Sequence, residues 1–389
     1  MSISKNPNFW YHILYTMTAE QIIRERIKHD GCISFRDFMD IALYAPQCGY
    51  YMKNSTEIGR GGDFFTASNL HMAFGWAIAR QIEEMWQIMK NPETFYIIEY
   101  GGGSGLICFD ILTSLKGREI FNTISYVIVE RNPHFQLKQK ARLTEFSDRI
   151  TWTAVMKDFP QVKGCVISNE LIDSFPVHLI EAKDGKIEEV YVDKNFNEKF
   201  LTPAAGVIDY LNEFNISIPL DLAHGYRTEI NLETRVWLSD VSEYLAEGFI
   251  LTIDYGYPAW EYYASERFSG TLMCYHKHRA HENPYINIGS QDITAHVNFT
   301  SLKTWGEAAG FNCLGFCPQG TFLVSLGIDE FLSKIAETED FAFQAAKVKR
   351  LITDGGMGVS HKVMIQYKGD EAFTLRGFSL RNRVASLLG

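Results

Sequence analysis

The chain has 389 residues and a formal net charge of −10, and 22% of its residues are charged. This length is sufficient for one large domain or two, and the excess of acids argues against general nucleic-acid binding, which needs a basic surface. No stretch is long and apolar enough to span a membrane, and the N-terminus is too polar for a signal peptide. We therefore expect a cytoplasmic protein without nucleic-acid partners and without membrane insertion.

Residues 1–92 predict a helical lobe that carries one long loop. Residues 17–30 place isoleucines on one helical face, and Thr18 can serve as the N-cap. Ser34 can begin a second helix in the same way. Residues 49–62 contain too many glycines for a regular element, and long loops of this kind are often functional.

A strand, a glycine loop and a helix are predicted at residues 95–115. The apolar run before the loop is typical of a buried strand, and helical spacing of apolar residues follows it. Between them, Gly101, Gly103 and Gly105 stand at alternate positions. Glycines allow a sharp turn and a close approach of a ligand to the backbone, and the following helix N-terminus offers unpaired N–H groups. The loop therefore predicts a nucleotide-like cofactor.

The residues around the loop favour S-adenosylmethionine over a dinucleotide. A dinucleotide fingerprint requires glycine or alanine where Leu106 stands. Glu99 precedes the first glycine, and its carboxylate suits the amino end of S-adenosylmethionine better than a pyrophosphate. Glu130 ends the next apolar strand, where a carboxylate can accept hydrogen bonds from ribose hydroxyls.

Strands and helices alternate through the rest of the chain, so residues 93–389 predict an α/β, Rossmann-like, mostly parallel sheet. A helix is expected at 133–146 and a strand at 249–253. Two insertions are expected, at about 176–230 and at 258–300. The first contains a hairpin that turns at Asp184-Gly185, and the second is rich in polar, aromatic and imidazole groups.

Polar residues follow the predicted strands at the edge where open α/β sheets bind ligands. Asn169, Glu170 and Asp173 follow one strand, and Asp254 and Tyr255 follow another. Asn169 is a candidate for the cofactor side. The other four are the candidate catalytic residues on the acceptor side, where carboxylates can hold a guanidinium. The structural alternatives are that Glu170 satisfies backbone N–H groups and that Asp173 caps the next helix.

No metal site is predicted from the cysteines or the histidines. The seven cysteines form no C-x-x-C pair, which favours buried free thiols in a reducing compartment. The histidines of the second insertion lack metal-ligand spacing on a helix, so structural or substrate-orienting imidazoles are expected. These histidines are His276, His278, His281 and His296.

An ordered series of motifs resembles the MidA-like family of S-adenosylmethionine-dependent methyltransferases. Mitochondrial members of that family resemble protein-arginine methyltransferases that act in the assembly of respiratory complex I. The series runs through Gly49-Tyr50-Tyr51, Gly62-Asp63-Phe64-Phe65-Thr66, the glycine loop, Asn169-Glu170-x-x-Asp173, Asp254-Tyr255-Gly256-Tyr257-Pro258, Gly270-Thr271-Leu272 and Gln291-Asp292-Ile293-Thr294-Ala295-His296.

The resemblance implies a class I methyltransferase fold, S-adenosylmethionine as methyl donor and S-adenosylhomocysteine as product. It implies cofactor contacts from Asp63 and Thr66, which otherwise form a helix cap. A protein acceptor is implied as partner, with a respiratory-complex subunit as one candidate, and a homodimer is one compatible assembly. Three positions depart from the family pattern: Asn69 and Trp76 stand where the family has acids, and Gly102 stands where it has proline.

These features predict an S-adenosylmethionine-dependent methyltransferase that acts on protein arginine. One alternative is a small-molecule O- or N-methyltransferase. Another is a non-catalytic assembly factor that keeps the cofactor as a structural ligand, which the loss of acids at Asn69 and Trp76 favours. An NAD-linked oxidoreductase is disfavoured by Glu99 and Leu106.

Overall fold

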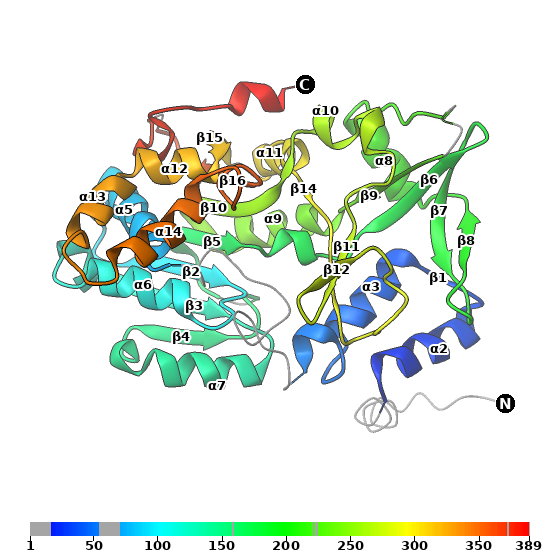
Figure 1. The fold of residues 1–389 in the computed structure, drawn as a ribbon, viewed down its shortest axis with the longest axis horizontal. Helices are drawn as coiled ribbons and strands as arrows, with labels where there is room; N and C mark the ends of the chain where they lie inside the picture. The colour runs from blue at the N-terminus through cyan, green and yellow to red at the C-terminus, as the bar shows by residue number, and fades with distance from the viewer. Residues whose placement is uncertain are drawn as a thin grey trace.

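An eight-stranded sheet forms the centre of the computed structural model, in the order β15-β16-β10-β5-β2-β3-β4 with β14 beside β10 (Figure 1). The structure describes residues 17–53, 71–157, 159–220, 222, 225–371 and 373–388. The strands of this sheet are β2 (Phe95–Tyr100), β3 (Ile124–Val129), β4 (Ile150–Thr153), β5 (Val162–Asn169), β10 (Leu245–Tyr257), β14 (Val297–Asn298), β15 (Asn312–Pro318) and β16 (His361–Lys368).

Strand direction in this sheet confirms the predicted α/β class. The strands β4, β3, β2, β5 and β10 pair in parallel, whereas β16 and β15 add antiparallel partners at one side. The chain runs outward from β2 to β4 and then returns to β5 on the other side of β2. The carboxyl ends of β2 and β5 therefore form the switch point at which open α/β sheets bind ligands.

Helices cover both faces of this sheet, as parallel strands require. Neighbouring residues of one strand face opposite cores: Ile97 packs with α5 and α6, whereas Ile98 packs with α8, α9 and α11. The helices that pack on the sheet or beside it are α5 (Ala73–Ile88), α6 (Leu106–Leu115), α7 (Pro133–Arg142), α8 (Ala205–Glu213), α9 (Glu233–Tyr244), α10 (Ala259–Tyr262), α11 (Phe299–Ala308), α12 (Gln319–Ser325), α13 (Ile328–Lys334) and α14 (Phe341–Ile352).

The first insertion, together with β1 of the N-terminal segment, forms a second sheet beside the large one (Figure 1). Its hairpin turns at Asp184-Gly185, as predicted, because Lys183 pairs with Lys186 across the turn. The strands of this sheet are β1 (Ile33–Ser34), β6 (His178–Lys183), β7 (Lys186–Val192), β8 (Glu198–Leu201) and β9 (Tyr226–Ile230). The second insertion forms a three-stranded sheet of β11 (Met273–His276), β12 (Arg279–His281) and β13 (Asp292–Thr294).

The first two helices are α2 (Ala19–Asp30) and α3 (Phe35–Tyr44). The Thr18 hydroxyl accepts a hydrogen bond from the backbone N–H of Gln21, and the Gln21 side chain accepts one from the Thr18 N–H, which completes a capping box. Ser34 caps α3 in a similar way. Both helices share a hydrophobic core with β6, β7 and the second insertion, whereas α5 belongs to the core of the large sheet.

Two element boundaries differ from the sequence-based expectation. The helix expected at 133–146 ends at Arg142 and is followed by a short 3-10 turn at Thr144–Phe146. Strand β10 is longer than 249–253, because it pairs with β5 and β16 on its two sides and its end pairs with β14. Long-range pairing of this kind leaves no local pattern in the sequence.

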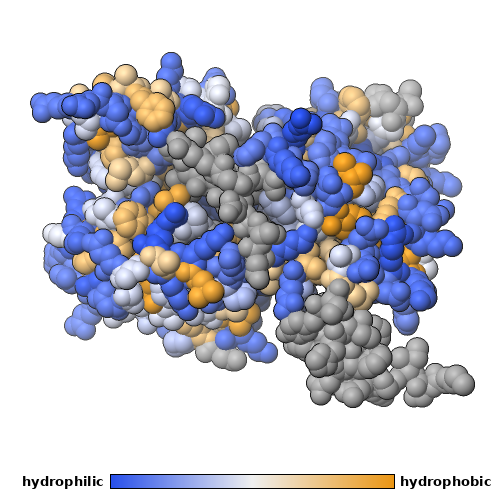
Figure 2. Space-filling model, turned by 60° about the horizontal axis from the view of Figure 1, so that its bottom comes forward, coloured by the Kyte–Doolittle hydropathy of each residue, from blue (hydrophilic) through white to orange (hydrophobic). Residues whose placement is uncertain are grey.

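The visible surface is mostly hydrophilic, and its apolar residues form small separate groups (Figure 2). Within the described residues, no helix is both long and apolar enough to cross a membrane.

Candidate active site

A cavity of about 810 Å³ opens at the switch point of the large sheet. Loops after four neighbouring strands line it: 101–104 after β2, 130–131 after β3, 154–157 after β4 and 169–171 after β5. Its other wall comes from α3 and α9. The volume lies within the range of sites for small molecules and cofactors.

The glycine loop turns the chain from β2 into α6 at the floor of this cavity. Gly101, Gly103 and Gly105 all have positive φ angles, of 64°, 49° and 77°. Gly105 is the N-cap of α6, and this backbone conformation is strained for residues with a side chain. The loop is fixed from behind, because the side-chain amide of Gln139 donates a hydrogen bond to the Gly103 carbonyl at 3.0 Å.

Glu99 lies under the loop and is only 2% exposed, yet it lines the cavity. Burial raises the pKa of its carboxyl to about 7, and the charge of Glu130 adds to the effect. The Tyr126 hydroxyl donates a 2.7 Å hydrogen bond to Glu99 Oε2, which opposes the rise in pKa. A ligand with a positive group in the cavity would favour the charged carboxylate.

Glu130 follows β3, and its carboxylate is held in place by neighbouring groups. The Asn132 N–H donates to Glu130 Oε1 at 2.8 Å, and the Gln139 side chain donates to Oε2 at 3.3 Å. Burial raises the pKa of Glu130 as well. The carboxylate is thus fixed at a strand end, where the sequence predicts a contact with ribose hydroxyls.

Glu170 is the predicted acceptor-side carboxylate that lines the cavity, together with Asn169. It directly follows β5 and has a φ angle of 47°, an uncommon conformation for a residue with a side chain. Its N–H donates to the Ile253 carbonyl at 2.9 Å, which anchors it to β10. Strained residues held by the surrounding fold are typical of functional sites.

Asp254, Asp173 and Tyr255 lie behind Glu170 and are not part of the described lining of the cavity. Asp254 is fully buried, and its two oxygens accept hydrogen bonds from the backbone N–H groups of Ile172, Asp173 and Tyr255. The Tyr255 hydroxyl donates to Asp173 Oδ2. Burial beside Asp254 raises the pKa of Asp173 well above its usual value. These contacts fit a supporting role for the three residues.

Two of the expected cofactor contacts, Asp63 and Thr66, lie outside the described residues, as does Asn69. Trp76, which replaces an acid of the family pattern, lies on α5. Its ring packs against Phe331, away from the cavity.

The wall opposite the glycine loop was not predicted from the sequence. Tyr44 and Tyr51 line the cavity from the N-terminal segment. The Tyr44 hydroxyl donates to the Ser174 carbonyl at 2.9 Å, and the Tyr51 hydroxyl donates to Asp292 Oδ1 at 2.6 Å. The motif Gly49-Tyr50-Tyr51 of the family pattern was the sequence feature that could have identified Tyr51.

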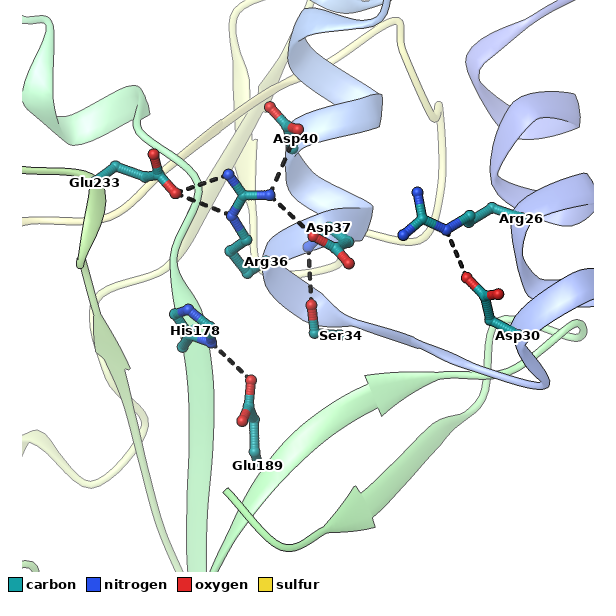
Figure 3. A network of polar contacts seen from close by, with 9 residues as sticks. All are labelled: Arg26, Asp30, Ser34, Arg36, Asp37, Asp40, His178, Glu189 and Glu233. Atoms are coloured by element: carbon teal, nitrogen blue, oxygen red, sulfur yellow. Dashed lines mark hydrogen bonds and ion pairs between the residues drawn. The ribbon is translucent and has the colours of Figure 1, made fainter. Parts of the chain in front are cut away.

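Arg36 joins the two sides of this wall (Figure 3). From α3, its guanidinium donates two hydrogen bonds to Glu233 Oε1 at the start of α9, at 2.7 and 3.1 Å. It also contacts the carboxylates of Asp37 and Asp40 on its own helix. One cation thus faces three carboxylates, which leaves this side of the cavity acidic.

Helix α9 adds more acid to the rim. Asp240 and Glu243 line the cavity and are exposed, and neither makes an ion pair within the described part of the chain. Burial and the nearby Glu243 raise the pKa of Asp240. A negative rim of this kind attracts a cationic ligand.

Comparisons with known proteins agree with this geometry. Residues 77–317 match the family described as "Putative S-adenosyl-L-methionine-dependent methyltransferase". A structure of a COG1565 superfamily member from Burkholderia thailandensis, bound to S-adenosyl-homocysteine, superposes with a TM-score of 0.85 at 29% identity over 100% of both chains. The predicted family and cofactor are confirmed.

Curated relatives share most of the chain. A Drosophila melanogaster protein named "Protein arginine methyltransferase NDUFAF7 homolog, mitochondrial" is 26% identical over 89% of this chain and 84% of its own length. The Homo sapiens protein arginine methyltransferase NDUFAF7 is 26% identical over 78% and 72% of the two chains. Both are named as mitochondrial proteins, so the expected cytoplasmic location is wrong: the charge and the polar N-terminus on which it rested do not report an organelle.

Proposed function

Because the chain belongs to the family of S-adenosyl-L-methionine-dependent methyltransferases, we propose that it methylates an arginine side chain of a protein. Relatives that carry this activity in their names support the acceptor class. The observation that carries the proposal is the position of Glu170, a carboxylate at the cavity wall between the cofactor loop and an acidic rim.

The donor side of the cavity fits S-adenosylmethionine. We assign the amino group of the donor to Glu99 and the ribose to Glu130, with the glycine loop against the methionine part. Asp63, Thr66 and Asn169 complete the proposed cofactor contacts. When bound, the donor supplies a methyl group on a positively charged sulfur.

The acceptor side holds and aligns the guanidinium. Glu170 can accept two of its N–H donors, which leaves a third nitrogen directed at the donor. Asp254 keeps Glu170 in place indirectly, because its carboxylate fixes the backbone of the turn after β5. Asp173 and Tyr255 form the layer behind this turn, where the Tyr255 hydroxyl donates a hydrogen bond to Asp173 Oδ2.

The acidic rim suits a basic protein segment around the arginine. Asp40, Asp240 and Glu243 lie where the acceptor protein would cross from the surface into the cavity. Opposite charges across an interface speed encounter and exclude acidic partners. A respiratory-complex subunit is the acceptor that the family resemblance suggests.

One experiment tests the proposal. The protein is incubated with methyl-labelled S-adenosylmethionine and a cell lysate, and labelled residues are identified by mass spectrometry. We expect label on arginine, and we expect Glu170→Gln to bind S-adenosylmethionine normally in calorimetry while losing transfer. Label on another residue type, or on small molecules alone, would contradict the proposal. Cofactor binding without any transfer would identify a non-catalytic binding protein.

A further inference from the structure

A histidine lies directly behind the carboxylate of the acceptor side. His361 is the first residue of β16, and its Nε2 is 3.8 Å from Glu170 Oε1. Both side chains are more than nine-tenths buried, with 8% and 9% of their surfaces exposed. His361 Nε2 has no hydrogen-bond partner in the described ranges. Glu170 thus separates this imidazole from the cavity, which Glu170 lines and His361 does not.

The surrounding strands fix the direction of the imidazole. His361 pairs with Tyr255 across β16 and β10, and the two rings pack edge to face with centroids 5.5 Å apart. Its other nitrogen, Nδ1, lies 3.1 Å from the Ser360 hydroxyl. When Nδ1 donates its hydrogen to Ser360, Nε2 carries a lone pair toward Glu170.

Methylation of arginine releases a proton that the site must accept. As the methyl group moves, the donor's C–S bond breaks with its electron pair on sulfur, and a new N–C bond forms. A guanidinium and a sulfonium thus give a methylguanidinium, a thioether and one proton. The attacking nitrogen loses that proton, since its lone pair becomes the new bond. This step rests on the proposed arginine acceptor.

We propose that the proton passes from the acceptor nitrogen to Glu170 and then to His361 Nε2. Glu170 touches the acceptor, whereas His361 is a positioning residue that acts through Glu170. The pair needs to close from 3.8 Å to hydrogen-bond distance, about 2.6–3.2 Å, as sites often do when substrate binds. After transfer, an imidazolium faces a carboxylate again, so Glu170 keeps its charge for the methylated product.

Several groups around His361 set its electrostatic surroundings. They are Glu170 after β5, Asp173 before β6, Asp254 and Tyr255 on β10, His296 after β13 and Lys362 on β16. Burial lowers the pKa of His296 to about 4, so this second histidine stays neutral near pH 7.

His296 provides a matched control. It packs against the same Tyr255 ring with centroids 5.0 Å apart, but it makes no ion pair with a carboxylate among the residues described. The variants His361→Gln and His296→Gln therefore each remove one imidazole that contacts the same tyrosine. Calorimetry with S-adenosylmethionine and thermal melting report whether each variant is folded.

The test is the pH dependence of single-turnover methylation at saturating S-adenosylmethionine. The acceptor is the lysate protein labelled by the wild-type enzyme, and the range is about pH 6 to 9. We expect the wild-type rate to fall on the acid side. His361→Gln should slow transfer about 100-fold and lose this acid limb, with unchanged cofactor affinity. His296→Gln should keep the wild-type profile.

The outcomes separate this inference from the proposed function. If arginine is labelled but the wild-type profile is flat, or His361→Gln keeps the rate and the acid limb, the proton path is wrong and the proposed function stands. If label falls on a residue other than arginine or on none, the proposed function fails and the proton path fails with it. If His361→Gln does not fold, the wild-type pH profile and the same rate measurements on His361→Asn decide whether the proton path holds.

Discussion

Tyr126 donates a hydrogen bond of 2.7 Å to Glu99 Oε2 beneath the glycine loop. The two residues lie on the adjacent strands β3 and β2, and both are almost fully buried. Burial nevertheless raises the pKa of Glu99 to about 7. Near neutral pH, Glu99 is therefore divided between a neutral acid and a carboxylate in the free enzyme.

This division predicts that cofactor affinity depends on pH. The donor's ammonium group requires the carboxylate, so binding below about pH 7 must release the proton of Glu99. Affinity should fall about tenfold per pH unit on the acid side. Calorimetry in two buffers of different ionisation enthalpy measures the released proton. Glu99→Gln should bind more weakly without this proton release, and Tyr126→Phe should move the midpoint upward.

A second prediction concerns the glycine loop. Gly103→Val introduces a branched side chain at a φ angle of 49°, directly beside the cavity. We expect S-adenosylmethionine affinity to fall at least about 100-fold, with a loss of about 1–3 kcal/mol in the free energy of unfolding. Gly117→Val is the control, because Gly117 has a φ angle of 82° and nothing within 4 Å of an added Cβ. It should lose stability but keep cofactor affinity.

The Arg36–Glu233 contact should couple α3 and α9, the two sides of one cavity wall. A double-mutant cycle with Arg36→Ala and Glu233→Ala is expected to give a coupling of about 1 kcal/mol in the free energy of unfolding, because the guanidinium donates two hydrogen bonds to one carboxylate. The Arg26–Asp30 pair, more exposed and within one helix (Figure 3), should give a clearly smaller coupling. Equal coupling energies for the two pairs would mean that Arg36 does not stabilise the contact between α3 and α9.

Charge reversal of the rim should weaken the protein acceptor and spare the cofactor. Asp240→Lys with Glu243→Lys is expected to raise the acceptor KM about tenfold at low salt, and less at high salt, because exposed charges are screened. Glu337→Lys with Glu339→Lys makes the same change in net charge at exposed positions outside the cavity lining. An equal rise in KM for both pairs would show that net charge, rather than the rim, controls encounter.

Local chemistry made much of the fold predictable from the sequence. Thr18 and Ser34 cap their helices through residues three positions away, and Asp184-Gly185 turns a hairpin by itself. The glycine loop, Glu99 and Glu130 likewise stand within one strand-loop-helix-strand unit, so their joint position at the cavity could be inferred.

Long-range contacts account for what could not be predicted. Asp254 follows the strand predicted at 249–253, as a catalytic acid does, but it lies within β10. Its Oδ2 accepts hydrogen bonds from N–H groups of a turn far away in the sequence. His361 belongs to no local motif and meets Glu170 only because β16 pairs with β10. In the sequence, Arg36 resembles any cation on a helix surface, because its partner Glu233 lies on α9, far away along the chain.

The pairing of β1 with β7 joins the N-terminal segment to a strand that is synthesised much later. The N-terminal segment carries Arg36, Tyr44 and Tyr51. Its hydrophobic core includes residues of strands that are synthesised much later, such as Cys274 on β11 and Ile293 on β13. Contacts so distant in sequence form slowly. A chain that is still emerging from a ribosome can thus complete its donor loop while one wall of the cavity is missing. Cofactor that binds only the finished cavity would stabilise that last docking step by mass action.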